Sequence, residues 1–88
     1  MKRVQFETTN KDGKKVLCEV IATYHDDETN KDFIVYTDRT YNEYKKLNIY
    51  YSLYREKDTS IELIEIKDLE DKKIGVQIIQ EIIKDLGN

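Results

Sequence analysis

Residues 3–24 read RVQFETTNKDGKKVLCEVIATY. In residues 3–9 polar and apolar side chains alternate, which is typical of a strand with one buried face. Asp12-Gly13 follows, and this pair favours a type I′ turn because both central residues of such a turn need positive φ. Alternation resumes in residues 15–24. The stretch therefore predicts an antiparallel hairpin of strands 3–9 and 15–24.

Three more runs of branched and aromatic residues follow, at about 33–37, 47–56 and 61–66. Polar segments separate them, and each is shorter than the crossover of about a dozen residues that parallel strands need. The sequence therefore predicts a five-stranded antiparallel β-meander.

The periodicity then changes to that of a helix. Over about 69–86 the apolar residues recur at helical spacing, with polar residues between them, at Ile78, Ile79, Ile82, Ile83 and Leu86. Gly87 stands where helices commonly end. We therefore expect one C-terminal amphipathic helix packed on one face of the sheet, in an α+β fold.

Residues 1–88 are expected to form a single domain, because this length is enough for one modest core and too short for two. Charged residues make up 38% and hydrophobic residues 39% of the chain, but the hydrophobic ones lie in patterned runs, which argues against disorder. The expected core is Val4, Phe6, Val16, Cys18, Val20, Phe33, Val35, Ile49, Tyr51, Leu53, Leu63, Ile79, Ile82 and Ile83.

Charge and composition argue against several classes of partner and location. The net charge of −3 provides no overall attraction to nucleic acids or acidic membranes. No stretch approaches the ~20 apolar residues of a membrane-spanning helix, and MKRVQFETTN lacks the apolar segment of a secretory signal. Cys18 is the single cysteine, so no internal disulfide forms. A cytoplasmic location is the default expectation.

Several of these segments, taken in order, resemble a known family. They are Asp12-Gly13 before residues 16–20, then Phe33-Ile34-Val35-Tyr36-Thr37-Asp38, Leu47-Asn48-Ile49-Tyr50 through Tyr54, and Glu62-Leu63-Ile64-Glu65-Ile66 before an amphipathic helix. The series is similar to short bacterial proteins, common in Gram-positive lineages, catalogued as domain of unknown function 1292. The similarity covers about Val4 to Leu86 and implies a small cytosolic single-domain protein. The resemblance implies no activity, cofactor or catalytic residue.

Two patterns in the sequence bear on metal binding. Alternation places His25 and Cys18 on opposite faces of the second strand, so they are not expected to share a zinc ion. The alternating acidic and amide residues 26–30 resemble the start of a calcium-binding loop. Lys31 and Thr37 occupy the positions where such a loop needs glycine and a bidentate glutamate, so the segment is expected to be a hairpin turn.

The sequence also indicates no catalytic arrangement of residues. No serine or cysteine is indicated as a nucleophile beside His25, and the glycines do not form a phosphate-binding pattern. Cys18 is expected to be a small buried hydrophobe, because its strand neighbours are apolar and a reactive thiol needs a cationic setting. Neither enzymatic activity nor a cofactor is expected.

The tyrosines support the functional prediction. Alternation places one apolar set, which includes Val16, Phe33 and Tyr51, under the helix, and leaves the second face uncovered. A large exposed apolar patch is typical of an interaction site. The predicted surface for a protein partner, or for a second copy in a homodimer, is Leu17, Ile21, Ile34, Tyr36, Tyr50 and Tyr54. In the alternative arrangement, loop 38–46 with Tyr41 and Tyr44 folds over this face.

A second function uses the same tyrosines to stack the bases of single-stranded nucleic acid. The cations available for this are Arg39, Lys45, Lys46 and Arg55, with Lys57 nearby. Asp38, Glu43 and Glu56 offset them to a local charge of about +2, which is weak beside the basic clusters of such proteins. Nucleic-acid binding is therefore the weaker of the two predictions.

Overall fold

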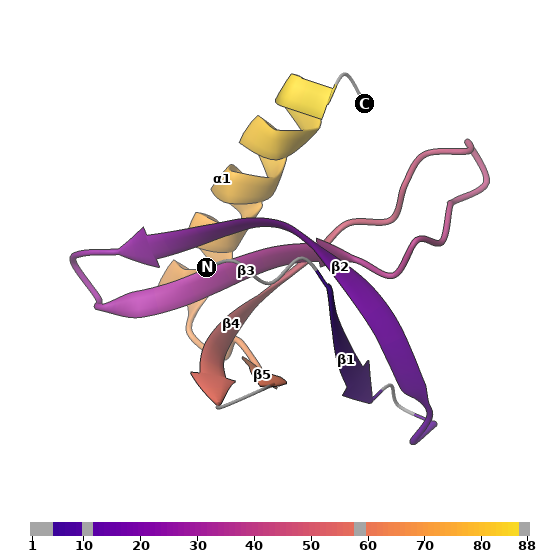
Figure 1. Ribbon diagram of the computed structural model, residues 1–88. Coiled ribbons are helices and arrows are strands. Elements are labelled where there is room, and N and C mark those ends of the chain that lie inside the picture. Colours follow the sequence, from indigo (N-terminus) through magenta and orange to yellow (C-terminus); the bar gives the residue numbers. More distant parts are fainter. Residues whose placement is uncertain (1–4, 10–11, 58–59, 87–88) are drawn as a thin grey trace.

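The computed structural model describes residues 5–9, 12–57 and 60–86 and shows one antiparallel sheet with a C-terminal helix (Figure 1). The sheet has five strands in the order β1-β2-β3-β4-β5, so each strand pairs with its neighbour in the chain. The predicted α+β meander is therefore confirmed. The elements are β1 (Gln5–Thr9), β2 (Lys15–Asp26), β3 (Lys31–Thr37), β4 (Tyr50–Lys57), β5 (Ser60–Ile64) and α1 (Leu69–Leu86).

The strands differ from prediction mainly at their ends. The first hairpin forms, with Thr9 opposite Lys15, and Gly13 has a φ of 79°. The type I′ turn stays a prediction, because residues 10–11 lie outside the described residues. β4 begins at Tyr50 rather than at residue 47, because residues 47–49 belong to the preceding connection.

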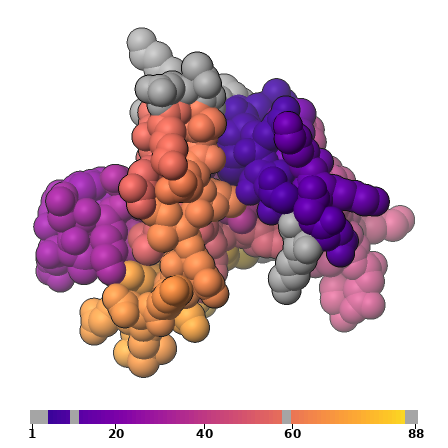
Figure 2. Space-filling view, turned by 90° about the horizontal axis from the view of Figure 1, so that it is seen from below, coloured from indigo at the N-terminus to yellow at the C-terminus, as the bar shows by residue number. Residues whose placement is uncertain are grey.

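A bulge in β2 gives the sheet its shape. The pairing of β2 with β3 shifts between Val20 and Ala22, so Ile21 is an extra residue on the longer strand. A bulge bends its strand and increases the local twist. The sheet curls until β1 approaches β5, and it becomes nearly barrel-shaped although these two edge strands are not paired (Figure 2).

The main core lies on the inner face of this curl. Its buried members are Phe6, Cys18, Ile34 and Ile61, and the half-buried side chains packed against them are Val16, Val20, Tyr36, Tyr54 and Leu63. Strict alternation predicts that Val16 and Val20 share a face with Phe33 and Val35, and this prediction is wrong. The bulge reverses the alternation along β2, so Val20 lies opposite Tyr36 while Ala22 lies opposite Val35.

A second apolar layer lies between the outer face of the sheet and α1. Phe33 and Val35 are buried and pair with Leu53 and Tyr51, and α1 contacts the two strands that carry them. Gly75 of α1 lies against the Tyr51 ring, where a side chain would overlap the ring carbons. Glycine is required here for the close approach of helix and sheet.

The predicted core is confirmed in part. Phe6, Cys18, Phe33 and Val35 are buried. The remaining described members of the predicted core are half-buried, namely Val16, Val20, Ile49, Tyr51, Leu53, Leu63, Ile79, Ile82 and Ile83. Val4 lies outside the described residues. Ile34 and Ile61 were not predicted, yet both are buried.

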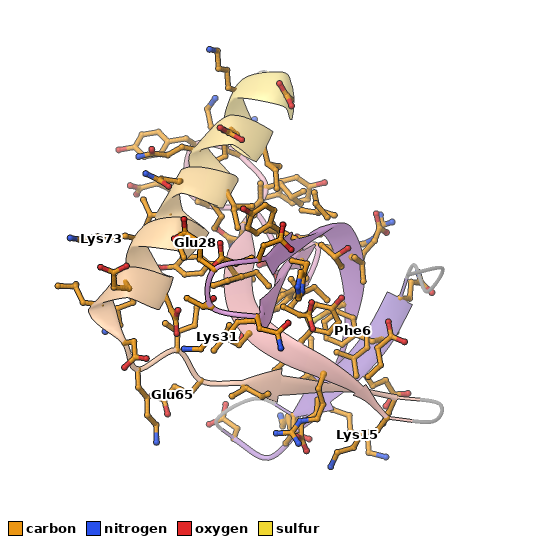
Figure 3. All side chains as sticks on the ribbon, turned by 90° about the vertical axis from the view of Figure 1, so that its left-hand side faces the viewer. Phe6, Lys15, Glu28, Lys31, Glu65 and Lys73 are labelled. Carbon is orange, nitrogen blue, oxygen red and sulfur yellow. The ribbon has the colours of Figure 1, made fainter. Side chains whose placement is uncertain are left out.

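An ion pair ties the start of α1 to the sheet. Lys31 Nζ lies 2.6 Å from Asp71 Oδ2 and 3.3 Å from Asp68 Oδ2, and Figure 3 shows Lys31 extending toward the beginning of the helix. Asp71 is only 2% exposed. The hydrogen bond from Lys31 to Asp71 is the main reason that the pKa of Lys31 is raised. This contact holds the beginning of α1 against β3, and the helix then packs on β3 and β4.

Candidate interaction groove

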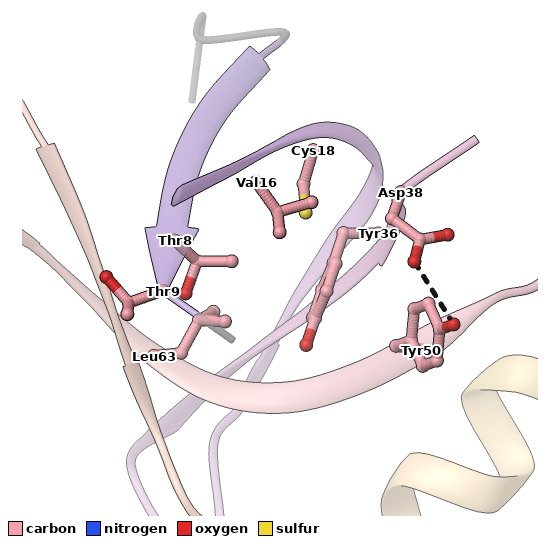
Figure 4. Close-up of a pocket in the computed structure, with 8 residues that line it drawn as sticks. All are labelled: Thr8, Thr9, Val16, Cys18, Tyr36, Asp38, Tyr50 and Leu63. Carbon is pink, nitrogen blue, oxygen red and sulfur yellow. Dashed lines mark hydrogen bonds between the residues drawn. The ribbon is translucent and has the colours of Figure 1, made fainter. Parts of the chain in front are cut away.

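The curled sheet leaves an open groove on its inner face (Figure 4). The groove has a volume of about 470 Å³ and receives side chains from all five strands and from the residue after β3. Its lining consists of Thr8, Thr9, Val16, Cys18, Tyr36, Asp38, Tyr50 and Leu63. This volume lies within the range of about 300–1,000 Å³ that is typical of ligand sites.

Aromatic rings form one wall of the groove. Tyr36 and Tyr50 are directly paired across β3 and β4, and their ring centroids are 5.6 Å apart with an interplanar angle of 33°. Behind them the Phe6 ring meets Tyr36 edge to face at 5.5 Å. Burial raises the pKa of Tyr36, and nearby negative charge raises it further. Tyr50 remains 39% exposed, so the wall is accessible from solvent.

A carboxylate stands beside this aromatic wall. Asp38 Oδ1 accepts hydrogen bonds from the Thr40 amide at 3.1 Å and the Thr40 hydroxyl at 2.5 Å, and Asp38 Oδ2 accepts one from the Tyr50 hydroxyl at 3.3 Å. Burial would raise the pKa of Asp38, but these hydrogen bonds outweigh it and hold the pKa below its usual value. Asp38 is therefore ionised at neutral pH, with a fixed orientation toward the groove.

From the sequence, Asp38 is expected only as a surface charge. The signal that could have identified it is the Asp-x-Thr spacing directly after a strand, since an aspartate there commonly caps the backbone two residues on. Thr8, Thr9 and Leu63 were not predicted as lining residues, because only the curl brings β1 and β5 to the same opening.

Cys18 lies at the base of the groove and is buried, which confirms its predicted place in the core. Burial is the main cause that raises the pKa of the thiol, and the charge of Asp38 adds to it. A thiol held in its protonated form is a poor nucleophile. The residue therefore contributes an apolar, neutral floor.

The six residues of the predicted interaction surface do not share one exposed face. Ile34 is 0% exposed because the curl encloses it, and Tyr36 and Tyr54 are half-buried beside it. Leu17 is 57% exposed, but alternation with Cys18 points it to the outer face. Ile21 is the bulge residue and is half-buried. The expectation of a flat, open face is thus wrong, and Tyr36 and Tyr50 are the two predicted residues that line the groove.

Loop 38–49 does not fold over the groove. It projects from the sheet, as Figure 1 shows, and leaves Tyr41 65% and Tyr44 75% exposed. The loop is closed by a bridge between Tyr41 and Leu47. At its base, the buried Thr37 hydroxyl donates to the Asn48 carbonyl at 2.7 Å and accepts from the Arg39 amide at 3.0 Å. Side chains from the strands of the curled sheet, and not the loop, cover Ile34.

The cations of the nucleic-acid hypothesis are not gathered at the groove. Arg39 is paired with Glu19, and Arg55 Nε lies 3.2 Å from Glu62 Oε1. Alternation along β4 places Arg55 on the face opposite Tyr50 and Tyr54. Lys45 and Lys46 are exposed on the projecting loop. None of the eight residues that line the groove is basic.

His25 is not part of the groove. It lies at the far end of β2, where its Nδ1 is 2.7 Å from Asp32 Oδ1, and this hydrogen bond is the main reason that the pKa of the imidazole is raised. The bulge places His25 and Cys18 on the same face rather than on opposite faces as expected. The two residues are still seven positions apart along β2.

The alternating residues after His25 form the turn of the β2–β3 hairpin. Asp26 Oδ2 accepts hydrogen bonds from the Thr29 amide at 3.1 Å and the Thr29 hydroxyl at 2.6 Å, and Asn30 takes a φ of 57°. Within the described ranges, no group of three or more His, Cys, Asp and Glu side chains is placed to hold a metal ion.

Comparison of the chain with protein-family models, with curated proteins and with solved structures finds no match. The resemblance to domain of unknown function 1292 therefore stays a prediction. Across the part of the chain that the structure describes, no helix is both long and apolar enough to cross a membrane.

Proposed function

We propose that this chain is a non-catalytic protein-interaction module, and that its binding site is the groove on the inner face of the curled sheet. The observation that carries the proposal is the open aromatic wall, where Tyr50 stays 39% exposed at the mouth of a cavity of about 470 Å³. Tyrosine is enriched at the centres of protein interfaces, because its ring supplies contact area while its hydroxyl can stay hydrated.

The chemistry of the lining favours binding over catalysis. Cys18 is buried with a raised pKa, and the Asp38 carboxylate already accepts hydrogen bonds from Thr40 and Tyr50. A catalytic site commonly pairs a nucleophile with a general base, and the eight lining residues hold no such pair. Apolar and aromatic surface with few fixed polar groups is typical of recognition sites.

Site-specific photocrosslinking tests this proposal. A photoreactive phenylalanine analogue at Tyr50 should crosslink to a partner protein in a cell extract, because the ring lies at the mouth of the groove. The same analogue at Tyr24 is the matched control, since Tyr24 is also an exposed strand tyrosine but packs beside Phe33 on the outer face. Equal crosslinking at both positions, or none at Tyr50, would contradict the proposal.

A homodimer stays a prediction and is read from the same experiment. Covalent dimers formed by the purified protein with the analogue at Tyr50 would identify the partner as a second copy. Light scattering on the unmodified protein would then have to report a dimer. Ile34 has no exposed surface, so any such dimer must use the rim of the groove rather than a flat sheet face.

A further inference from the structure

The groove carries a charge of one sign only. Among its eight lining residues the single group ionised at neutral pH is Asp38, and no lysine, arginine or histidine is among them. Burial is the main cause that raises the pKa values of Cys18 and Tyr36, and the charge of this carboxylate adds to both. The groove therefore favours a positively charged group.

The aromatic wall adds a second attraction for a cation. The rings of Tyr36 and Tyr50 lie 5.6 Å apart, and the Tyr50 hydroxyl is 3.3 Å from Asp38 Oδ2, so rings and carboxylate border the same space (Figure 4). An ammonium group is attracted to the negative face of an aromatic ring, most strongly where it is partly removed from water. The apolar floor of Val16 and Cys18 suits the methylene chain that carries such a group.

The edges of the sheet favour a peptide as the carrier of this cation. Among the described residues β1 pairs only with β2, and β5 pairs only with β4, so each strand has one unpaired edge. Thr8 and Thr9 on β1 and Leu63 on β5 border the groove. These two edges approach each other, and a strand added between them would need a gap of about 9.6 Å. We therefore expect an extended partner segment to cross the mouth of the groove and to insert one side chain.

We propose that the groove binds a lysine side chain from an extended segment of a partner protein, with its ammonium between the Asp38 carboxylate and the rings of Tyr36 and Tyr50. This inference rests on the proposed function and names the chemistry that the groove recognises. Binding is reversible and involves no covalent step.

The test is a nuclear magnetic resonance titration of isotope-labelled protein with the capped peptide Ala-Val-Lys-Val-Ala. The lysine peptide should shift the amide signals of Tyr36, Asp38 and Tyr50. The same peptide with norleucine in place of lysine keeps the straight aliphatic chain but removes the charge, and it should bind about tenfold more weakly, a difference of about 1.4 kcal/mol. Equal affinity of the two peptides would overturn the proposal.

Two protein variants locate the site. Asp38→Asn should weaken binding of the lysine peptide about tenfold, whereas Asp27→Asn, which removes one exposed carboxylate from the β2–β3 turn, should leave it unchanged. Tyr50→Leu should also weaken binding, which keeps the test decisive if Asp38→Asn disturbs the loop. An equal loss in Asp27→Asn would show that only net charge matters, and would overturn the proposal.

Butylammonium tests the source of the cation. If it binds as tightly as the lysine peptide, the backbone contributes nothing, and the assignment to a peptide is overturned. This titration is independent of the crosslinking experiment. A crosslink at Tyr50 together with no preference for lysine would leave the proposed function standing and remove only the lysine inference.

Discussion

A few single residues set how the helix and the sheet approach each other. Gly75 would be expected to weaken α1, because glycine in a helix interior is less stable than alanine by about 1 kcal/mol. Its position against Tyr51 explains its presence, since a side chain there would overlap the ring. The buried Asp71 acts at the start of the same helix by holding Lys31 of β3. These two contacts determine where α1 lies.

We expect Gly75→Ala to destabilise the protein despite its better helix propensity. Overpacking against Tyr51 costs about 1–3 kcal/mol, and the propensity gain of about 1 kcal/mol offsets only part of this. Chemical denaturation measures the free energy of unfolding. In a Tyr51→Ala background the ring is absent, so the same Gly75→Ala change should become neutral or stabilising. A loss of similar size in both backgrounds would contradict the close contact.

Among the strands, β2 decides which side chains share a face. Its register shift at Ile21 assigns Val16, Cys18 and Val20 to the inner face and Ala22 to the outer face. The same bulge promotes the curl that brings β1 to β5 and encloses Ile34. One extra residue thus changes both the membership of the core and the shape of the candidate groove.

Substitutions at Ile34 and Leu17 therefore distinguish an enclosed sheet from an open one. Ile34→Ala should lower the free energy of unfolding by about 2–5 kcal/mol, because a fully enclosed side chain leaves a cavity. Leu17→Ala should change it by no more than about 0.5 kcal/mol, because Leu17 is mostly exposed. Denaturation of both variants gives the comparison. Similar small losses for both would mean that Ile34 faces solvent after all.

For the molecule as a whole, the titrating groups define a range of stable pH. Burial raises the pKa of Cys18, Tyr36 and Tyr54 above their usual values of 9.0, 10.0 and 10.0. Hydrogen bonds outweigh burial at Asp38 and lower its pKa below 3.8. The folded chain thus retains protons in alkali that the unfolded chain releases, and in acid it retains a negative charge that the unfolded chain loses.

Stability should consequently decline on both sides of neutrality. The contribution of the three raised groups is complete below their unfolded pKa values and is lost as the pH rises above 9.0. The contribution of Asp38 is complete above 3.8 and is lost as the pH falls below it. Chemical denaturation from pH 3 to 11 measures the loss of unfolding free energy in both acid and alkali. Cys18→Ala should reduce the alkaline slope, which is about 1.4 kcal/mol per pH unit for each proton, whereas an unchanged slope would contradict the buried thiol.

The sequence by itself determined the order, number and pairing of the strands and the position of the helix. These follow from local patterns: alternation, short polar turns, and apolar residues at helical spacing. It also determined that Phe6, Cys18, Phe33 and Val35 lie inside. Each of these predictions depends only on residues that are close together in the sequence.

Only the tertiary structure decided which face each side chain occupies and where the groove lies. A bulge has no clear signal in the run Glu19-Val20-Ile21-Ala22, because any of these residues fits a regular strand, yet it reverses the alternation beyond it. Tyr36, Asp38 and Tyr50 become a site only when the curl brings Thr8, Thr9 and Leu63 to the same opening. That curl depends on twist accumulated over five strands, which no short segment encodes.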